Sequence, residues 1–379
     1  MNFELNDEQR ALQESLRRLL AKQYTFEKRR VYAESTTGHD EHTWEKFAEL
    51  GLTALLVPEA FGGFGGGARD LLPVMQELGA ALSLEPLLAS NVLAAAALRL
   101  TADNATCAEV LPQVATGKRR LAWAHNERAG RHSALWIEST ATNTGKQWRI
   151  NGNKASVIGA IFADQLIVSA RIRGAPDEEV GCALFLVDAN GEGVDSRHYR
   201  LVDDTSATDI SLQYAEAVPL TDPMDCKRAD SAIEGTQALG IAAVCAEMVG
   251  ASQAALTLTI EYLNTRKQFG RVIGENQALR HRAAEMLVSL ELAKSMAIAA
   301  AVAVDDPADE SAKLDLHRAK YSVARHARAV AHGAIQLHGG IGMTEEYAVG
   351  HYLRRIHVLD QLFGDGDTHT AKLASLAHA

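Results

Sequence analysis

One segment in the second half of the chain groups three residue types that suit a phosphorylated ligand with a flat ring. Arg266 offers a planar guanidinium that can donate paired hydrogen bonds to a pyrophosphate. Gln268 adds a hydrogen-bonding group, and Phe269 can lie against a ring. The same residues also fit an ordinary helix end with a surface arginine, because short motifs have many false matches.

A second segment combines glycines with one polar side chain. Gly339, Gly340 and Gly342 follow Gln336 within two helical turns. Glycines let the backbone approach a ligand closely, and Gln336 could contribute a polar contact. The alternative is a helix that ends at a glycine stop. The two segments are therefore candidate ligand contacts, and neither is decisive alone.

The spacing of apolar residues predicts the elements that carry these segments. From residue 7 to about 117 the spacing is helical, with a glycine-rich break at 62–67. Between about 118 and 222 the period is two, and Asn151-Gly152 is typical of a hairpin turn. The chain then returns to helical spacing over four segments: 229–265, 275–304, 311–337 and a final helix after Thr344.

We therefore expect an α+β fold with three domains. These are an N-terminal α-helical domain at 1–117, a middle β domain at 118–222 and a C-terminal helical bundle at 223–379. Strands and helices do not alternate, which excludes a doubly wound dinucleotide-binding sheet. Helices as long as 229–265 need packing partners on several faces, so the bundle is expected to continue across a subunit interface.

Composition narrows the function classes further. The 379-residue chain is 47% hydrophobic and carries a net charge of −10 without a Lys/Arg-rich run, which argues against a nucleic-acid partner. The four cysteines are far apart and the histidines form no H-E-x-x-H, so neither a disulfide framework nor a metal site is expected. The polar start and the short apolar run at 94–97 suggest no membrane segment, and we expect a cytoplasmic protein.

Over nearly its whole length the chain resembles the acyl-CoA dehydrogenases. The resemblance rests on both ligand segments, the opening FELNDEQRAL, the stretch 49–59 and Trp148–Lys154. It implies an acyl-CoA dehydrogenase-like fold with a C-terminal four-helix bundle, and FAD as cofactor. By that match the contacts to the adenine and pyrophosphate end of FAD, which is bound mainly by a neighbouring subunit, are Arg266, Gln268, Phe269, Gln277, Gln336, Gly339 and Gly340.

The middle domain departs from the family pattern. Family members hold the flavin ring and thioester with a T-E-P-x-A-G-S-D loop and a W-I/V-S/T triplet, which here correspond to 126–133 and 156–158. His132 replaces the serine, Ser156 the stacking tryptophan and Ile158 the flavin-bonding threonine. We therefore expect that this chain's own β domain does not hold the ring.

The catalytic base of the family is also missing from its usual positions. Desaturation needs a carboxylate that removes an α-proton. The two places where family members carry a glutamate are occupied here by Gly240 and by the loop 362–368. Glu247, two helical turns after Gly240, and Asp365 are possible substitutes, although a buried ion pair and a helix cap are the more ordinary explanations for them.

As a whole, the pattern resembles the small subunits of heteromeric bacterial acyl-CoA dehydrogenases such as pimeloyl-CoA dehydrogenase. The resemblance implies a larger homologous subunit in an α2β2 assembly, an acyl-CoA substrate of the dicarboxylic or steroid side-chain type, and electron transfer flavoprotein as acceptor. Two alternatives remain: a homo-oligomeric dehydrogenase that uses Glu247 or Asp365, and a non-catalytic scaffold subunit.

Overall fold

The computed structural model describes residues 4–178 and 180–377, so Met1–Phe3 of the polar start lie outside the described residues. It has the acyl-CoA dehydrogenase fold expected from the sequence, with N-terminal helices, a central β-barrel and a C-terminal helical domain. Residue contacts divide the chain into two compact units, and the boundary between them falls within α7 (Cys226–Thr265). One unit comprises Met1–Val31, Gly67–Ser83 and Ile241–Ala379, and the other Tyr32–Gly66 and Leu84–Gly240.

The N-terminal helices begin at side chains that cap them. Asn6 and Gln9 form a reciprocal capping box at the start of the first helix, and Asp40 and Asp103 accept hydrogen bonds from backbone N–H groups at two later helix starts. These caps fix where the chain turns between helices. The helices are α1 (Asp7–Gln23), α2 (Phe26–Glu34), α3 (Glu41–Glu49), α4 (Ala68–Ala81), the π-helix Leu88–Ala94, α5 (Ala95–Thr101) and α6 (Asn104–Ala115).

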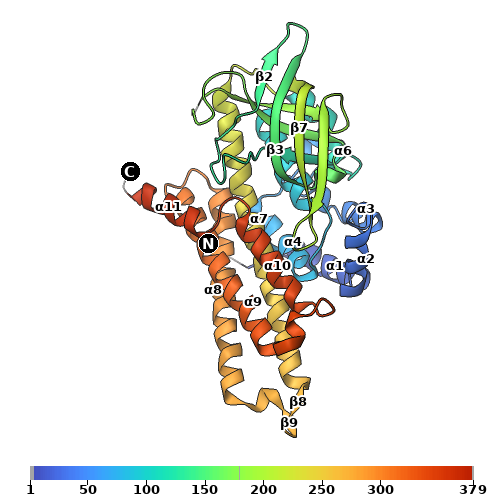
Figure 1. The fold of residues 1–379 in the computed structure, drawn as a ribbon, viewed down its shortest axis with the longest axis vertical. Coiled ribbons are helices and arrows are strands. Elements are labelled where there is room, and N and C mark those ends of the chain that lie inside the picture. Colours follow the sequence, from blue (N-terminus) through green and yellow to red (C-terminus); the bar gives the residue numbers. More distant parts are fainter. Residues whose placement is uncertain (1–3, 179, 378–379) are drawn as a thin grey trace. The chain divides into compact units, whose positions relative to one another are not determined.

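The described strands of the middle region form a closed ring (Figure 1). They are β1 (Leu121–Ala124), β2 (Thr140–Asn143), β3 (Trp148–Ile158), β4 (Gln165–Arg171), β5 (Cys182–Asp188), β6 (Val194–Arg200) and β7 (Ser206–Pro219). β4 pairs with β5, β5 with β7, β7 with β3, β3 with β2, and β2 returns to β4. β1 lies parallel to β4, and β6 pairs with the first half of β7. Closure leaves no open edge along this ring.

The hairpin predicted at Asn151-Gly152 is wrong in position. Both residues lie inside β3, and the turn between β2 and β3 falls at 144–147 instead. The pairing of β3 with β7 shifts register between Ile150 and Gly152, which marks a β-bulge. A Cβ at Gly152 would lie 2.2 Å from the Ser139 Oγ, so this glycine serves close packing and not a turn.

The C-terminal helices carry both ligand segments. They are α7, α8 (Gln277–Asp305), α9 (Ala312–His338), α10 (Val349–Gln361) and α11 (Gly366–Ala377). α9 packs against α8, α10 and α11 (Figure 1). The single final helix predicted after Thr344 is in fact two, because Gly364 has a φ of +107° and Asp365 accepts a hydrogen bond from the Thr368 N–H at the start of α11.

Two of these helices are strongly apolar. α7 and α8 are each long and apolar enough to cross a membrane by length and composition alone. Of the most apolar window, 89% is buried in α7 and only 33% in α8. Leu287, Val288 and Leu292 of α8 are between 47% and 61% exposed. α7 is thus a core helix, whereas α8 presents an apolar face that a neighbouring molecule could cover.

Candidate functional site

The first ligand segment forms a small hairpin after α7. β8 (Lys267–Gln268) and β9 (Arg271–Val272) pair across a turn that contains Phe269, and the Ile273 N–H donates to the Arg266 carbonyl. Phe269 has a φ of +54° and is fully exposed. Within the described residues, the guanidinium of Arg266 and the amide of Gln268 make no hydrogen bond or ion pair. A fully exposed phenylalanine beside unpaired polar groups is typical of a surface that binds another molecule.

The second ligand segment is an exposed glycine turn at the end of α9. Gly339 has a φ of +64°, and no described atom lies within 4 Å of a Cβ built on Gly339 or Gly340. Gln336 is exposed one turn earlier, and the structure shows no partner for its amide among the described residues. The backbone here is open to a ligand on the side where a side chain would otherwise stand.

The structure brings the two segments together. The Tyr262 ring, one turn before Arg266, lies 4.5 Å from the ring of His338, which immediately precedes Gly339. Gln277, also expected to contact the ligand, is exposed at the start of α8. The residues that the resemblance assigns to the ligand all lie in the same compact unit, and the Tyr262–His338 contact links the two segments that carry most of them.

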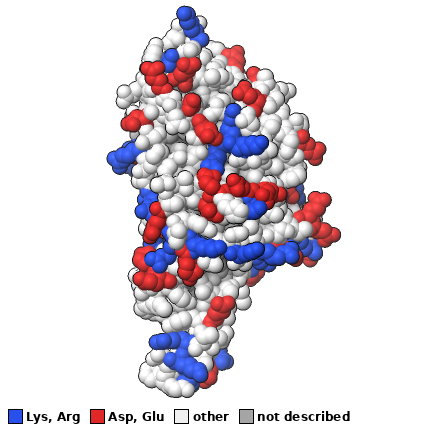
Figure 2. All heavy atoms as spheres, turned by 90° about the vertical axis from the view of Figure 1, so that its right-hand side faces the viewer, with Lys and Arg blue, Asp and Glu red and all other residues white. Residues whose placement is uncertain are grey.

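The surface around the hairpin is basic. Arg266, Lys267 and Arg271 are exposed there, and Arg280 bonds the Gly274 carbonyl nearby. Figure 2 shows blue basic side chains gathered at the end of the molecule that carries β8 and β9, whereas elsewhere on this face the two signs are mixed. Local positive charge of this kind attracts a phosphorylated ligand despite the net charge of −10.

The positions expected to face a flavin ring in the β domain look different. Ser156 lies at the end of β3 with a φ of +53°, and its N–H donates to an Asp209 Oδ at 3.1 Å. Tyr199 bonds both the Ser156 hydroxyl at 2.9 Å and the Asp209 carboxylate at 3.1 Å. Arg128 donates to Asp209 at 2.6 Å. The polar groups at this position therefore satisfy one another.

The negative charge of Asp209 is stabilised by groups of the same domain. Burial would raise the pKa of Asp209, but hydrogen bonds from the Ser156 N–H, Arg128 and Tyr199 outweigh burial and lower it. Asp209 is thus a carboxylate held by three donors of the same domain. His132 and Ile158 are half-buried, and Ser156 is exposed. Position 156 itself has no aromatic side chain, and the nearby Tyr199 is bonded to Ser156 through its hydroxyl. No local sequence pattern indicates the Asp209 network.

The residues that this loop shares with the family have a structural role. Glu127 and Lys154 are buried and joined by a 2.6 Å ion pair. Lys154 also donates to the Ser169 hydroxyl, and Glu127 accepts from the hydroxyl and N–H of Ser139. Burial would raise the pKa of Glu127, but the charge of Lys154 and the hydrogen bonds lower it. The pair ties the loop after β1 to β3, which explains its retention where the exposed positions have changed.

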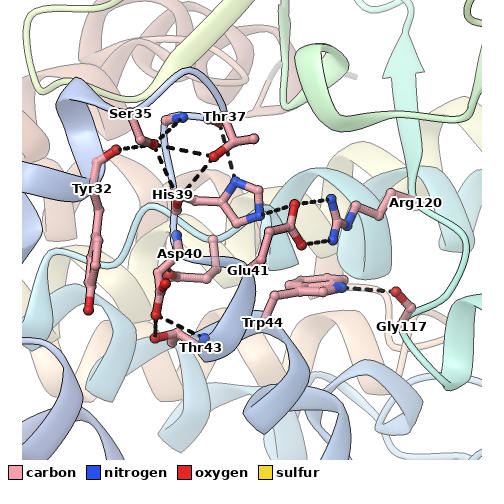
Figure 3. A network of polar contacts seen from close by, with 12 residues as sticks. Tyr32, Ser35, Thr37, His39, Asp40, Glu41, Thr43, Trp44, Gly117 and Arg120 are labelled. Atoms are coloured by element: carbon pink, nitrogen blue, oxygen red, sulfur yellow. Dashed lines mark hydrogen bonds and ion pairs between the residues drawn. The ribbon is translucent and has the colours of Figure 1, made fainter.

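A second network anchors the start of β1 to the helix α3 (Figure 3). Arg120, which directly precedes β1, forms a two-pronged ion pair with Glu41 and lies over the ring of Trp44. Trp44 donates to the Gly117 carbonyl at 2.9 Å, and the buried His39 ring faces Glu41 at 3.4 Å. Members of this network are separated by about eighty residues in sequence, which is why sequence reasoning missed it.

Glu247, one of the two possible bases, forms a buried ion pair with an arginine. It is 2% exposed on α7, and Arg355 of α10 donates to it from Nε at 2.7 Å and also from its terminal nitrogen. A carboxylate paired in this way inside a protein is stabilised in its charged form and is held away from other partners. The geometry favours the structural interpretation of Glu247 over the catalytic one.

Asp365, the other possible base, caps a helix. Its Oδ1 accepts from both the N–H and the hydroxyl of Thr368 at the start of α11. The neighbouring Gly364 is buried, and a Cβ there would lie 2.9 Å from the Thr368 Cγ2. Lys320, buried beneath the loop, donates to the Gly364 carbonyl at 3.0 Å. The loop is therefore built around a glycine at the position where the family can carry its base.

Comparisons with known proteins agree with this fold. Residues 6–118 match the acyl-CoA dehydrogenase N-terminal domain, and residues 233–376 match the acyl-CoA dehydrogenase C-terminal domain. The chain is 30% identical over 94% of its length to the acyl-CoA dehydrogenase IpdE2 of Mycobacterium tuberculosis, of which it covers 93%.

Two solved structures that are each named for two proteins are also similar. A variant of the Tcur3481-Tcur3483 steroid enzyme is 29% identical with a TM-score of 0.87, covering 98% of each chain. The ChsE4-ChsE5 complex of Mycobacterium tuberculosis shares the fold at 24% identity, with a TM-score of 0.86 and all of both chains covered. With both terminal domains matched and a full-length relative at 30% identity, this chain is a member of the FAD-dependent acyl-CoA dehydrogenase family.

Proposed function

We propose that this chain is the smaller subunit of a heteromeric acyl-CoA dehydrogenase and supplies the adenine and pyrophosphate clasp to FAD held mainly by a larger homologous subunit. One observation carries the proposal: the side chains of the clasp are exposed and have no partner in the part of the chain that the structure describes, while the groups at the ring position are bonded to one another. Arg266 is the example of the first and Asp209 of the second.

FAD, the cofactor of this family, fits one part of the chain and not the other. At the clasp, Gly339 and Gly340 leave open space beside the backbone, and Arg266 can pair with a pyrophosphate. At the ring position, Ser156 offers no stacking face, and the Asp209 carboxylate would stand near a ring that gains negative charge when it accepts hydride. A flavin clasped here would therefore have its ring held by another chain.

The proposed reaction is α,β-desaturation of an acyl-CoA thioester. A carboxylate removes the α-proton, and the flavin, when bound, supplies the hydride acceptor. Gly240 and Gly364 stand at the family's base positions, and Glu247 is paired with Arg355. The base of the composite site is accordingly assigned to the larger subunit.

Partner and substrate follow from the same argument. The apolar face of α8, with Val288 61% exposed, suits burial against a homologous chain in an α2β2 assembly.

The names of the similar steroid enzymes favour a bulky acyl-CoA of the steroid side-chain type over a dicarboxylic one. Electron transfer flavoprotein is the proposed acceptor, and the cytoplasm the proposed location. The domain boundaries at 117/118 and 222/223 remain part of this proposal.

Two other functions are weaker. A homo-oligomeric dehydrogenase would need Glu247 or Asp365 as base, but the first is in a buried ion pair and the second caps α11. A scaffold subunit without cofactor contacts would not need Arg266 and Gln336 to be exposed and unpaired among the described residues, or the glycine turn to be open.

The FAD content of purified assemblies tests the proposal. The tagged chain is expressed alone and, separately, recovered from its native host so that a homologous subunit can co-purify. We expect little FAD in the isolated chain, and stoichiometric FAD with dehydrogenase activity in the heteromer. Stoichiometric FAD in a homo-oligomer would refute the division of the site, and a heteromer whose FAD content ignores changes at Arg266 would favour the scaffold.

A further inference from the structure

An aromatic stack links the two FAD-clasp segments. The ring of His338 lies 4.5 Å from that of Tyr262 at an interplanar angle of 31°, and 5.0 Å from that of Tyr347 at 52°. Tyr262 is on the last turn of α7, His338 is the last residue of α9, and Tyr347 follows the glycine turn. Three separate stretches of the C-terminal unit therefore meet at one imidazole.

Two residues of this stack, Tyr262 and His338, are joined directly to clasp residues. The Tyr262 carbonyl accepts a hydrogen bond from the Arg266 N–H at 2.9 Å. His338 is bonded covalently to Gly339, whose φ of +64° turns the chain out of the helix. Since Gly339 and Gly340 meet no described atom on their open side, the stack and the turn that follows fix where their backbone stands. A shift of His338 would move the glycine turn relative to Arg266.

The imidazole is held in one orientation. Its Nδ1 must be the protonated nitrogen, because it donates to the Ala334 carbonyl at 2.7 Å. Nε2 is buried and has no hydrogen-bond partner among the described residues. Burial lowers the pKa of His338, although the Ala334 and Leu258 carbonyls oppose this shift. A buried ring that is tied to the Ala334 carbonyl has little freedom to turn, so it can act as a fixed spacer between its neighbours.

We infer that His338 is a positioning residue for the FAD clasp, which sets the distance between the Arg266 hairpin and the Gly339-Gly340 turn by packing between Tyr262 and Tyr347. The inference rests on the proposed function, because it concerns the same clasp. His338 itself lies 3% exposed behind the glycines and does not contact the ligand. Its effect on FAD is exerted through the backbone of the two segments.

His332 is a matched control on the same helix. It lies one turn before Gln336 and about two turns before Gly339 on α9, and its ring contacts that of His357 edge-on at 5.8 Å. His332→Ala removes an imidazole and one ring contact but leaves the stack of Tyr262, His338 and Tyr347 in place. A loss of FAD binding that follows from any weakening of α9 would appear in both variants, whereas a positioning effect would appear only at His338.

Titration of FAD and of ADP into the flavin-stripped assembly that contains this chain tests the inference. ADP probes the clasp alone, because it lacks the flavin ring. Measured well below the melting temperature, His338→Ala should lower the affinity for both FAD and ADP at least about tenfold. His332→Ala should lower it less than about twofold. His338→Phe, which keeps a ring in the stack, should restore most of the affinity. If His338→Ala does not assemble, Tyr347→Leu removes one side of the stack and should weaken ADP several-fold.

A double variant separates this inference from the proposed function. If His338 acts by placing Arg266, the effects of His338→Ala and Arg266→Ala on ADP binding should combine to less than their product. Unchanged affinity in Arg266→Ala would refute the clasp itself. A normal loss in Arg266→Ala, with His338→Ala equal to His332→Ala or with multiplicative effects, would leave the clasp intact and overturn only the role of His338.

Discussion

The proposed FAD clasp in the C-terminal unit and the ring position in the β domain differ in how their polar groups are bonded. At the clasp, Arg266 and Gln336 are exposed and unpaired among the described residues, and the backbone at Gly339 is open. At the ring position, Ser156 and Asp209 are bonded within the same domain. The polar groups of the first surface are available to a ligand, whereas those of the second are bonded to one another.

This difference separates two kinds of retained residue. Glu127 and Lys154 of the ring loop are buried and paired with each other, whereas Arg266 is exposed and is proposed to contact a ligand. Similarity to a family motif therefore does not by itself indicate a binding role. Burial and existing partners decide which interpretation applies, and the following variants examine the two regions in turn.

The largest effect is expected from Lys154→Met in the ring region. Removing one partner of a buried ion pair leaves the Glu127 carboxylate uncompensated and should lower the free energy of unfolding by about 3–5 kcal/mol. Urea unfolding measures the loss, with exposed Lys146→Met as the control. At temperatures where the variant is folded, FAD affinity of the assembly should not change. A parallel drop in FAD affinity would mean that this loop contributes to the cofactor site after all.

Glu247→Gln should cost stability and spare catalysis. The substitution keeps the size of the side chain but leaves Arg355 without its charged partner, which we expect to lower the free energy of unfolding by about 3 kcal/mol. kcat per folded heteromer should stay within a few-fold of the parent, with exposed Glu261→Gln on the same helix as control. A fall in kcat of about a hundredfold or more at normal FAD content would identify Glu247 as the base.

Arg266→Ala should weaken FAD binding without destabilising the fold. Loss of a charge-assisted contact to a pyrophosphate is worth about 1.5–3 kcal/mol, which corresponds to about tenfold to hundredfold in Kd. Flavin fluorescence during titration of the assembly reports this change. Arg325, exposed on α9, provides the matched arginine-to-alanine control. Equal affinities in the two variants would show that Arg266 is an ordinary surface residue.

The smallest effect is expected from Ser156→Ala at the ring position. The variant loses one exposed hydrogen bond to Tyr199, and the free energy of unfolding should change by less than about 0.5 kcal/mol. FAD affinity should be unaltered, because the Ser156 hydroxyl already has a partner in the same domain. A measurable weakening of FAD would place the flavin ring against this domain and remove the contrast between the two regions.

Local sequence patterns predicted the fold well because they reflect short-range physics. Helical spacing and the change to a period of two located the helices and the β region. The Asn151-Gly152 hairpin prediction failed because glycine serves bulges as well as turns, and only the approach of Ser139 distinguishes them. The clasp residues came from resemblance, which the sequence supports residue by residue.

Side-chain pairs between residues far apart in the chain could not be predicted from the sequence. Arg355 lies 108 residues from Glu247, and Asp209 lies 53 residues from Ser156. Nothing local marks either pair, because each side chain is an ordinary charged or polar residue in its own segment. The stack around His338 also required coordinates, since its three rings come from different stretches of the chain.

The apolar face of α8 has a consequence for the life of the protein in the cell. Leu287, Val288 and Leu292 would remain in water on any chain that has not found its partner. Molecular chaperones and quality-control proteases recognise such surfaces, and unassembled chains aggregate through them. In the proposed heteromer, balanced synthesis of the two subunits would then govern how much of this chain accumulates, and an excess of it would be degraded.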